Sequence, residues 1–251
     1  MRIAISASQC QGKTTLCNDI LKNWPSYVKS PESYRKIVKE SNLPVNKQVT
    51  KDSQLKILTA LYEDCKQFTK FTDKVVYDRC PLDNIVYSLW AFDKQSSDID
   101  GKFMQECTDI VKEAMRFFDI VFFLPITKVA PVKLEERDLR EIDEEYVTEI
   151  DNIFKAVAYQ HSKNNCPFFI KGDAPPIIEI FGSPIERIEL LKQYLDNDGN
   201  LVAADTSVLD INQLGDIESL IQDQKNQMNF ELKEKKIITN IRQDVKSQKN
   251  K

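Results

Sequence analysis

The sequence predicts an α/β protein built on a parallel β-sheet, and three observations lead to this fold class. An apolar run at residues 3–5 is followed by a loop that contains Gly12, and apolar residues at helical spacing come after the loop. Further short apolar runs, each followed by a helical pattern, recur along the chain, and this alternation favours parallel strands. Residues 120–124 are apolar without interruption, as in a strand that helices cover on both faces.

Length and composition suit one large domain with appendages. The 251 residues are too few for two domains of ordinary size, and 41% of them are hydrophobic, which allows a substantial core. The net charge of −4 argues against duplex nucleic acid as the main partner. The first residues lack a charged region followed by a long apolar stretch, and the longest apolar run, 120–125, is too short to span a bilayer. We therefore expect no signal peptide and no membrane contact.

The six cysteines and the single histidine, His161, are poor material for a zinc site or a disulfide framework, because no two cysteines have C-x-x-C spacing. A reducing cytoplasm is the expected location. Cys10 and Cys80 lie inside the two main motifs, and we interpret them as small fillers because no histidine base is near them in the sequence.

The first motif runs from Ala7 to Thr14 and reads A-x-x-x-x-G-K-T, a phosphate-binding loop with alanine in place of the usual first glycine. The backbone N–H groups of such a loop, with the N-terminus of the following helix, hold the phosphates of a nucleotide such as ATP. Lys13 is expected to reach the β- and γ-phosphates, and Thr14 to hold Mg²⁺. A chance match is the alternative, but the strand before the motif and the helix after it favour function. The predicted nucleotide-binding residues are Ala7, Ser8, Gln9, Cys10, Gln11, Gly12, Lys13, Thr14 and Thr15.

The helix after the loop is expected to end near Pro25, with a short strand at residues 26–30. Glu32 and Arg35 follow that strand, so in a parallel sheet they would face the same crevice as the loop. A carboxylate and a guanidinium there suit a sugar or base and a phosphate, which makes both residues candidates for substrate binding. The equally weighted alternative is a helix N-terminus with Glu32 near the dipole and Arg35 in solvent.

Residues 52–68 predict a helix whose apolar stripe faces the core. Gln54 lies beside the stripe, and we favour a surface position for it over contact with a base. The stripe consists of Leu55, Leu58, Leu61, Tyr62 and Cys65.

The second motif follows the apolar strand 75–77 and begins with Asp78 and Arg79. Pro81 suits the first turn of a helix, so the pair is expected at the carboxyl end of the strand, beside the phosphate-binding loop. There Asp78 would order Mg²⁺-bound water or accept a proton from the nucleophile, and Arg79 would bind a phosphate. The alternative is that the two residues cap the helix and form a surface ion pair.

The strand at residues 119–124 ends without an acidic residue. A motor-type ATPase usually carries a metal-binding aspartate at that position, so its absence favours phosphoryl transfer to a small acceptor. The charge-dense stretch 133–145 contains Arg137 and Arg140, which share one face of a helix. We interpret these two as catalytic residues of a lid that closes over the γ-phosphate and excludes water, and the acidic residues around them as solvated.

Residues 146–161 predict another helix, with His161 as a capping or surface residue, and residues 176–181 predict the last strand. A final helix follows, with Ser183 as its N-cap. The turn between strand and helix is expected to pack on an adenine ring, so Gly182 and Arg187 are candidates for ATP binding.

The turn-rich segment 196–200 marks a boundary between a domain at residues 1–195 and an extension at 196–251 that is expected to be mostly helical or partly disordered. From Asp223 to the end, the sequence contains eight lysines and arginines but only four acidic residues, so this stretch is positively charged. A solvated appendage is the default interpretation, and a nucleic-acid contact or a homodimer-forming helix are the alternatives.

The motifs at residues 7–14, 78–87 and 137–140 resemble those of the P-loop nucleoside and nucleotide kinases, with an AAA-type P-loop domain. The Asp78-Arg79 segment is similar to that of thymidylate kinases, whereas residues 31–35, 139–143 and 181–187 look more like the nicotinamide-riboside-kinase type. The resemblance covers about residues 1–195. It implies a three-layer P-loop NTPase fold with a five-stranded parallel sheet in the order 2-3-1-4-5.

By the same resemblance, Lys13 and Thr14 bind ATP and Mg²⁺, Asp78 serves the acceptor, and Arg79 and Arg35 bind it, while Arg137 and Arg140 form the lid. The expected function is a Mg-ATP-dependent kinase that acts on a (deoxy)nucleoside monophosphate. One alternative is a kinase for nicotinamide riboside or another nucleoside 5′-hydroxyl, with Asp78 as base. The other is a nucleotide-dependent switch that acts on a macromolecular partner.

Overall fold

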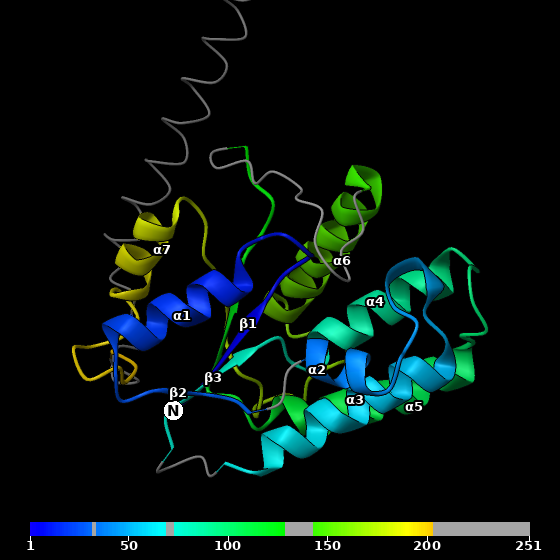
Figure 1. The fold of residues 1–251 in the computed structure, drawn as a ribbon, viewed down its shortest axis with the longest axis horizontal. Helices are drawn as coiled ribbons and strands as arrows, with labels where there is room; N and C mark the ends of the chain where they lie inside the picture. Colours follow the sequence, from blue (N-terminus) through cyan, green and yellow to red (C-terminus); the bar gives the residue numbers. More distant parts are fainter. Residues whose placement is uncertain (32–33, 69–72, 129–142, 203–251) are drawn as a thin grey trace, which may run out of the picture. The chain divides into compact units, whose positions relative to one another are not determined.

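A parallel β-sheet forms the centre of the protein in a computed structural model that describes residues 1–31, 34–68, 73–128 and 143–202 (Figure 1). Within these ranges the five strands lie in the order β2-β3-β1-β4-β5, all parallel, which confirms the order that the kinase resemblance implied. The strands are β1 (Arg2–Ser6), β2 (Val28–Lys29), β3 (Val75–Asp78), β4 (Ile120–Phe123) and β5 (Ile177–Glu179).

Helices cover both faces of the sheet, because successive strand residues point to opposite sides and both sides are apolar. Ile3, Ile5 and Val76 pack on one side, in a core with α1 and α7. Ala4 and Tyr77 pack on the other side, in a core with α4, α5 and α6. The α-helices of the described residues are α1 (Lys13–Asn23), α2 (Tyr34–Glu40), α3 (Lys51–Lys66), α4 (Pro81–Asp93), α5 (Gly101–Met115), α6 (Glu144–Ser162) and α7 (Pro184–Leu191), and a short 3₁₀ helix, η1 (Asn46–Gln48), precedes α3.

The register of the central strands brings two chain segments together at one edge. Ile5 of β1 pairs with Asp78 of β3, and Ser6 pairs with Phe123 of β4. The N–H of Arg79 then donates to the carbonyl oxygen of Ile5 at 3.1 Å. The loop after β1 and the residues after β3 therefore leave the sheet at the same level and side by side.

Helix α3 is rotated relative to the predicted stripe. Leu55, expected in the core, is 41% exposed, whereas Gln54, expected on the surface, is only 3% exposed. Both predictions were wrong, because the amide of Gln54 finds a partner in Asn84 of α4, and a polar group with a hydrogen bond can be buried. The residues that α3 buries are Ser53, Gln54, Ile57, Leu58, Leu61, Asp64 and Cys65.

The chain after α7 folds back onto the end of α1. The Trp24 indole N–H donates to the carbonyl oxygen of Asp196 at 2.7 Å, and the Tyr27 hydroxyl donates to that of Gly199 at 2.6 Å. Leu195 and Leu201 form an isolated antiparallel bridge that closes this turn. Of the two units into which the chain divides, 1–202 and 203–251, the second lies outside the described residues. No helix in the described ranges has the length and apolar character that a membrane span needs.

Gly199 provides a test of this packing. Its φ is +80°, and a Cβ there would lie 2.6 Å from the Tyr27 ring. Gly199→Ala should therefore lower the free energy of unfolding by about 1–3 kcal/mol, measured by urea denaturation. Two matched controls separate the causes: Gly172→Ala has the same positive φ in open space, and Gly101→Ala has neither problem. Equal losses at Gly199 and Gly172 would show that Tyr27 does not pack against the turn.

Candidate active site

A tight loop joins β1 to α1 and supplies backbone amides at the N-terminus of the helix. Cys10 (φ 65°) and Gly12 (φ 82°) both adopt the left-handed conformation, which turns the chain sharply into α1. Gly12 is the N-cap of α1. A Cβ on Gly12 would also lie 3.0 Å from the guanidinium of Arg187, so glycine is required for two reasons.

The surroundings of Ala7 explain why the loop tolerates alanine where the motif usually has its first glycine. Its side chain is fully buried in the core that α1 and α7 share. Its φ is not positive, so the backbone there does not require glycine. The methyl group adds to the core and leaves the loop conformation unchanged.

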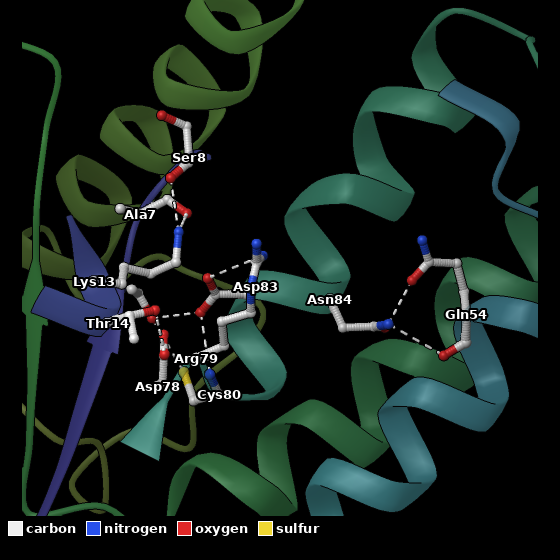
Figure 2. A network of polar contacts seen from close by, with 11 residues as sticks. Ala7, Ser8, Lys13, Thr14, Gln54, Asp78, Arg79, Cys80, Asp83 and Asn84 are labelled. Atoms are coloured by element: carbon white, nitrogen blue, oxygen red, sulfur yellow. Dashed lines mark hydrogen bonds and ion pairs between the residues drawn. The ribbon is translucent and has the colours of Figure 1, made fainter. Parts of the chain in front are cut away.

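Lys13 lies folded over the loop, as Figure 2 shows. Its Nζ donates to the carbonyl oxygens of Ala7 at 2.8 Å and Ser8 at 2.7 Å, and its side chain is nearly inaccessible to solvent. Burial and the nearby positive charge of Arg79 lower the pKa of Lys13 to about 7, although Asp83 and Asp78 act in the opposite direction. The amino group of Lys13 is thus held next to the backbone amides of the loop, which would face a bound phosphate.

Thr14 and Asp78 connect the loop to the end of β3. The Thr14 hydroxyl donates to Asp78 Oδ2 at 2.6 Å, and Lys29 of β2 forms an ion pair with the same oxygen at 3.4 Å. Burial opposes ionisation of Asp78. The hydrogen bond from Thr14 and the positive charges of Lys13 and Lys29 outweigh burial and lower the pKa of this carboxyl. Asp78 is consequently a carboxylate at neutral pH.

Arg79 is held in one position by aromatic rings and by its backbone. Its φ of 92° is unusual for a residue with a side chain. Its guanidinium carbon lies 4.3 Å from the centre of the Tyr34 ring and 5.6 Å from that of Tyr87. An ion pair of 3.8 Å with Asp83 completes these contacts. The guanidinium is therefore already positioned for a ligand.

Asp83 lies between the two parts of the site. In the first turn of α4 its Oδ2 accepts hydrogen bonds from Ser6 Oγ at 2.7 Å and from the N–H of Cys80 at 3.1 Å. Burial raises the pKa of Asp83, against the opposing charges of Lys13 and Arg79. Asp83, not Asp78 or Arg79, forms the capping box of α4. The alternative in which Asp78 and Arg79 cap the helix at the surface is therefore excluded.

Cys80 behaves as the expected small filler. Its Sγ lies 3.2 Å from Ser6 Oγ, and burial together with the charge of Asp83 raises the pKa of the thiol to about 12. A thiol that stays protonated is a poor nucleophile.

A small pocket, partly open to solvent, lies beside Arg79. Its apolar side is made by Val49, Ile57 and Leu61, and its aromatic side by Tyr34 and Tyr87. The polar residues that line it are Asn46, Gln54, Arg79, Asp83 and Asn84. A concave lining of apolar and aromatic side chains with a few polar groups is typical of small-molecule sites.

The remaining predicted site residues differ in how close they lie to the loop and the pocket. Arg35 is exposed on α2 and does not line the pocket, and Thr15 is exposed on α1. Arg187 is buried, and its Nη1 donates to the carbonyl oxygen of Gln11 at 2.7 Å, so it contacts the loop directly. Gly182 (φ 92°) precedes the Ser183 cap of α7. The side chains of Glu32, Arg137 and Arg140 lie outside the described residues.

Several pocket residues carry only weak signals in sequence patterns. Asp83 stands in the first turn after Pro81, a position that usually indicates only helix capping. Tyr34, Tyr87 and Gln54 fall within ordinary helical patterns, and only tertiary packing brings them to Arg79. His161 was expected as a cap or surface residue, and it packs against Phe169 with ring centres 4.3 Å apart.

The oxygen atoms at the end of β3 suit a magnesium ion. Mg²⁺ prefers hard oxygen ligands and is usually held by one or two carboxylates together with substrate phosphates. The hydroxyl of Thr14 and the ionised carboxylate of Asp78 are adjacent here. Among the described residues there is no cluster of three or more His, Cys, Asp and Glu that would hold a metal by itself.

The chain is similar to one protein family and to several solved structures. The family model described as AAA domain matches residues 2–173. The structure of deoxyadenosine kinase from M. mycoides with dCMP and dCDP bound is 18% identical with a TM-score of 0.57, and the match covers 78% of this chain and 99% of that one. Thymidylate kinase from Candida albicans is 15% identical with a TM-score of 0.51, covering 80% of this chain and 94% of that one.

A third similar structure is that of NadR protein in complex with NAD and AMP-PNP, which is 12% identical with a TM-score of 0.52. That match covers 80% of this chain and 51% of NadR. No curated protein sequence matches the chain. The family match confirms the expected AAA-type domain, and the solved structures confirm that the chain has the fold of P-loop nucleoside and nucleotide kinases.

Lys13 gives a pH test of the site. A lysine with pKa about 7 in the folded protein and about 10.4 in the unfolded chain makes the unfolded state bind more protons between these values. Stability contributed by this group therefore rises with pH across that window, by at most about 1.4 kcal/mol per pH unit. In urea denaturation at pH 7 and pH 9.5, Lys13→Met should remove this rise. Lys22→Met, a change at an exposed lysine of α1, should keep it.

Proposed function

The chain belongs to the AAA domain family, and from that premise we propose that it is a Mg-ATP-dependent kinase that phosphorylates a (deoxy)nucleoside monophosphate. The observation that carries the proposal is the contact between Thr14 of the loop and Asp78 of β3. It brings the phosphate-binding elements and the carboxylate to one point, next to a pocket that Arg79 and two tyrosines line. We assign the kinase to residues 1–195.

The loop supplies the donor half of the proposed site. Backbone amides of residues 8–12 and the N-terminus of α1 form a cradle for phosphates, and Lys13 is stored on the carbonyl oxygens of Ala7 and Ser8. Thr14 and Asp78 would hold Mg²⁺, which neutralises charge on the phosphates. ATP supplies the γ-phosphoryl group, which passes to an oxygen of the acceptor and leaves ADP.

The state of Asp78 favours a monophosphate over a nucleoside hydroxyl as acceptor. A hydroxyl must lose a proton as it attacks, and a general base works best when its pKa is near the operating pH. The pKa of Asp78 is lowered instead, which suits a residue that orders a metal or its water. A phosphate oxygen is already ionised at neutral pH and needs no base.

Arg79 is the proposed binding residue for the acceptor. A planar guanidinium matches phosphate geometry, and the ring of Tyr34 holds it in place. Arg35, Glu32 and the predicted lid arginines Arg137 and Arg140 remain candidates for the acceptor and the γ-phosphate. Gly182 and Arg187 remain candidates for the adenine side.

The proposed activity is tested by the release of ADP in a panel of nucleoside monophosphates and nucleosides, nicotinamide riboside included. We expect at least one monophosphate to stimulate ADP release well above the rate without acceptor. Stimulation by nucleosides alone would favour a hydroxyl kinase. Slow hydrolysis that responds to no acceptor would instead support a nucleotide-dependent switch.

Asp78→Asn should lower turnover by roughly 10²-fold, because the loss of one charge at the metal position weakens transition-state stabilisation. Binding of ATP in the absence of Mg²⁺, measured by calorimetry, should change little. Asp52→Asn is the matched control, since Asp52 is an exposed residue of α3 that forms an ion pair with Lys56. Full turnover in Asp78→Asn would refute the assigned role.

Arg79→Lys should raise the acceptor KM by about tenfold or more while leaving the ATP KM nearly unchanged, because a lysine cannot form the bidentate, ring-supported contact. Initial rates at varied acceptor and fixed ATP give this value. Arg116→Lys, at an exposed arginine bound to Glu113, serves as control. An equal rise in both KM values would mean that Arg79 acts on the loop rather than on the acceptor.

A further inference from the structure

Arg187 of α7 is a buried cation beside the phosphate-binding loop, and the loop motif at residues 7–14 does not include it. Its side chain belongs to a residue that is only 6% exposed, and Nη1 donates to the main-chain carbonyl oxygen of Gln11 at 2.7 Å. The same nitrogen would lie 3.0 Å from a Cβ placed on Gly12. The guanidinium therefore packs directly against the second half of the loop.

The packing of α7 on α1 holds Arg187 in this position (Figure 1). The loop, α1 and α7 share one apolar core, whose members include Ala7, Leu16, Ile188 and Leu191. Arg187 comes directly before one of these core residues in the sequence. The contact between the guanidinium and the loop is therefore a consequence of how the two helices pack.

The charge of Arg187 is not neutralised by a carboxylate among the described residues. Glu186 accepts a hydrogen bond from the N–H of Ser183 at 2.7 Å in the capping box of α7, and Glu189 pairs with Lys192 at 2.7 Å. Arg187 Nε is buried and makes no hydrogen bond within the described ranges. Burial lowers the pKa of Arg187, but an arginine keeps its charge at neutral pH. A buried cation of this kind is unfavourable alone and is stabilised by a nearby anion.

The hydrogen bond to Gln11 also determines how one loop amide is oriented. The peptide between Gln11 and Gly12 is trans, so its C=O and N–H groups point in opposite directions. Because Arg187 holds the Gln11 oxygen on the side of α7, the N–H of Gly12 points away from α7. Lys13 holds two other carbonyl oxygens of the same loop. Two cations from different helices thus hold the loop by its carbonyl oxygens, and they orient the amides that bind phosphate in such loops.

We propose that Arg187 is a positioning residue for a bound polyphosphate, because it orients the peptide between Gln11 and Gly12 and adds a positive charge on the α7 side of the loop. This role differs from the adenine-side role considered above, since the guanidinium contacts the loop backbone. The inference rests on the proposed function for the use of ATP as phosphate donor. Binding of a polyphosphate itself requires no phosphate transfer.

The affinities of the full chain for inorganic tripolyphosphate and for ATP, measured by calorimetry without Mg²⁺, test this role. Tripolyphosphate has the phosphates of ATP but no base. Arg187→Met should weaken the binding of both ligands by about tenfold, because a charge-assisted contact that supports the loop is lost. The ratio of the two affinities should therefore stay constant. Weaker binding of ATP with unchanged binding of tripolyphosphate would place Arg187 at the base and overturn the proposal.

A second variant, Arg187→Lys, separates charge from packing. Lysine and methionine are both unbranched and of similar length, but only lysine carries a charge. The lysine variant should bind tripolyphosphate more tightly than the methionine variant does. Equal affinities in the two folded variants would show that Arg187 only fills space, and they would overturn the proposal. Arg187→Gln replaces the methionine variant if that variant does not fold.

Arg116→Met is the matched control for the loss of one arginine charge. Arg116 is an exposed residue that pairs with Glu113 and Asp173, away from the loop contacts described above. Both affinities should be unchanged in this variant. A tenfold loss in Arg116→Met as well would show that net charge, and not the position of Arg187, determines the binding.

The outcomes separate this inference from the proposed function. Weaker tripolyphosphate binding in Arg187→Met, in a protein that transfers phosphate to no acceptor, would keep the role of Arg187 and reject the kinase. Phosphate transfer to an acceptor, with unchanged tripolyphosphate binding in Arg187→Met, would keep the kinase and reject the role. Absence of both ATP and tripolyphosphate binding in the unsubstituted chain would reject both.

Discussion

The parallel pairing of β1 with β3 is the constraint on which the site depends. Because Ile5 is opposite Asp78, the loop that begins one residue after β1 and the charged pair that ends β3 leave the sheet together. Thr14, the second residue of α1, can then donate a hydrogen bond to the Asp78 carboxylate. A shift of this register by one residue would turn Asp78 to the other face of the sheet and separate the two halves.

Charge burial is the second organising feature, and it follows from the first. Lys13 and Asp83 are buried and Arg79 is only partly exposed, and all three lie near the carboxyl ends of the strands, where isolated buried charges are costly. Asp83 is satisfied on one oxygen by Ser6 and by the start of α4, and Lys13 by two loop carbonyls. Arg79 and Asp83, whose ion pair is 3.8 Å long, both line the pocket. Strain of this kind is typical of binding sites, because a ligand completes the contacts.

Sequence patterns predicted what is local and missed what depends on packing between helices. The loop motif and the strand before Asp78 are each set by adjacent residues, so Lys13, Thr14 and Asp78 could be placed at one edge of the sheet. The phase of α3 could not be predicted, since Leu55 and Gln54 differ by one position and hydrophobicity favoured the wrong one. Only the partner on α4, Asn84, makes a buried glutamine favourable.

Charges on one side of the proposed site act on groups on the other side, so binding at the two positions is linked energetically. Arg79 lies against the proposed acceptor pocket, yet its positive charge is, after burial, the main cause that lowers the pKa of Lys13 in the loop. An anion bound beside Arg79 offsets that charge and so favours the ammonium form of Lys13, the form that binds phosphate. The same reasoning applies in reverse, because a phosphate on the loop weakens the repulsion that Arg79 experiences. In the proposed kinase, two anionic ligands would occupy neighbouring positions with Lys13 and Arg79 between them, and Asp78 and Asp83 limit the excess of positive charge when both positions are empty.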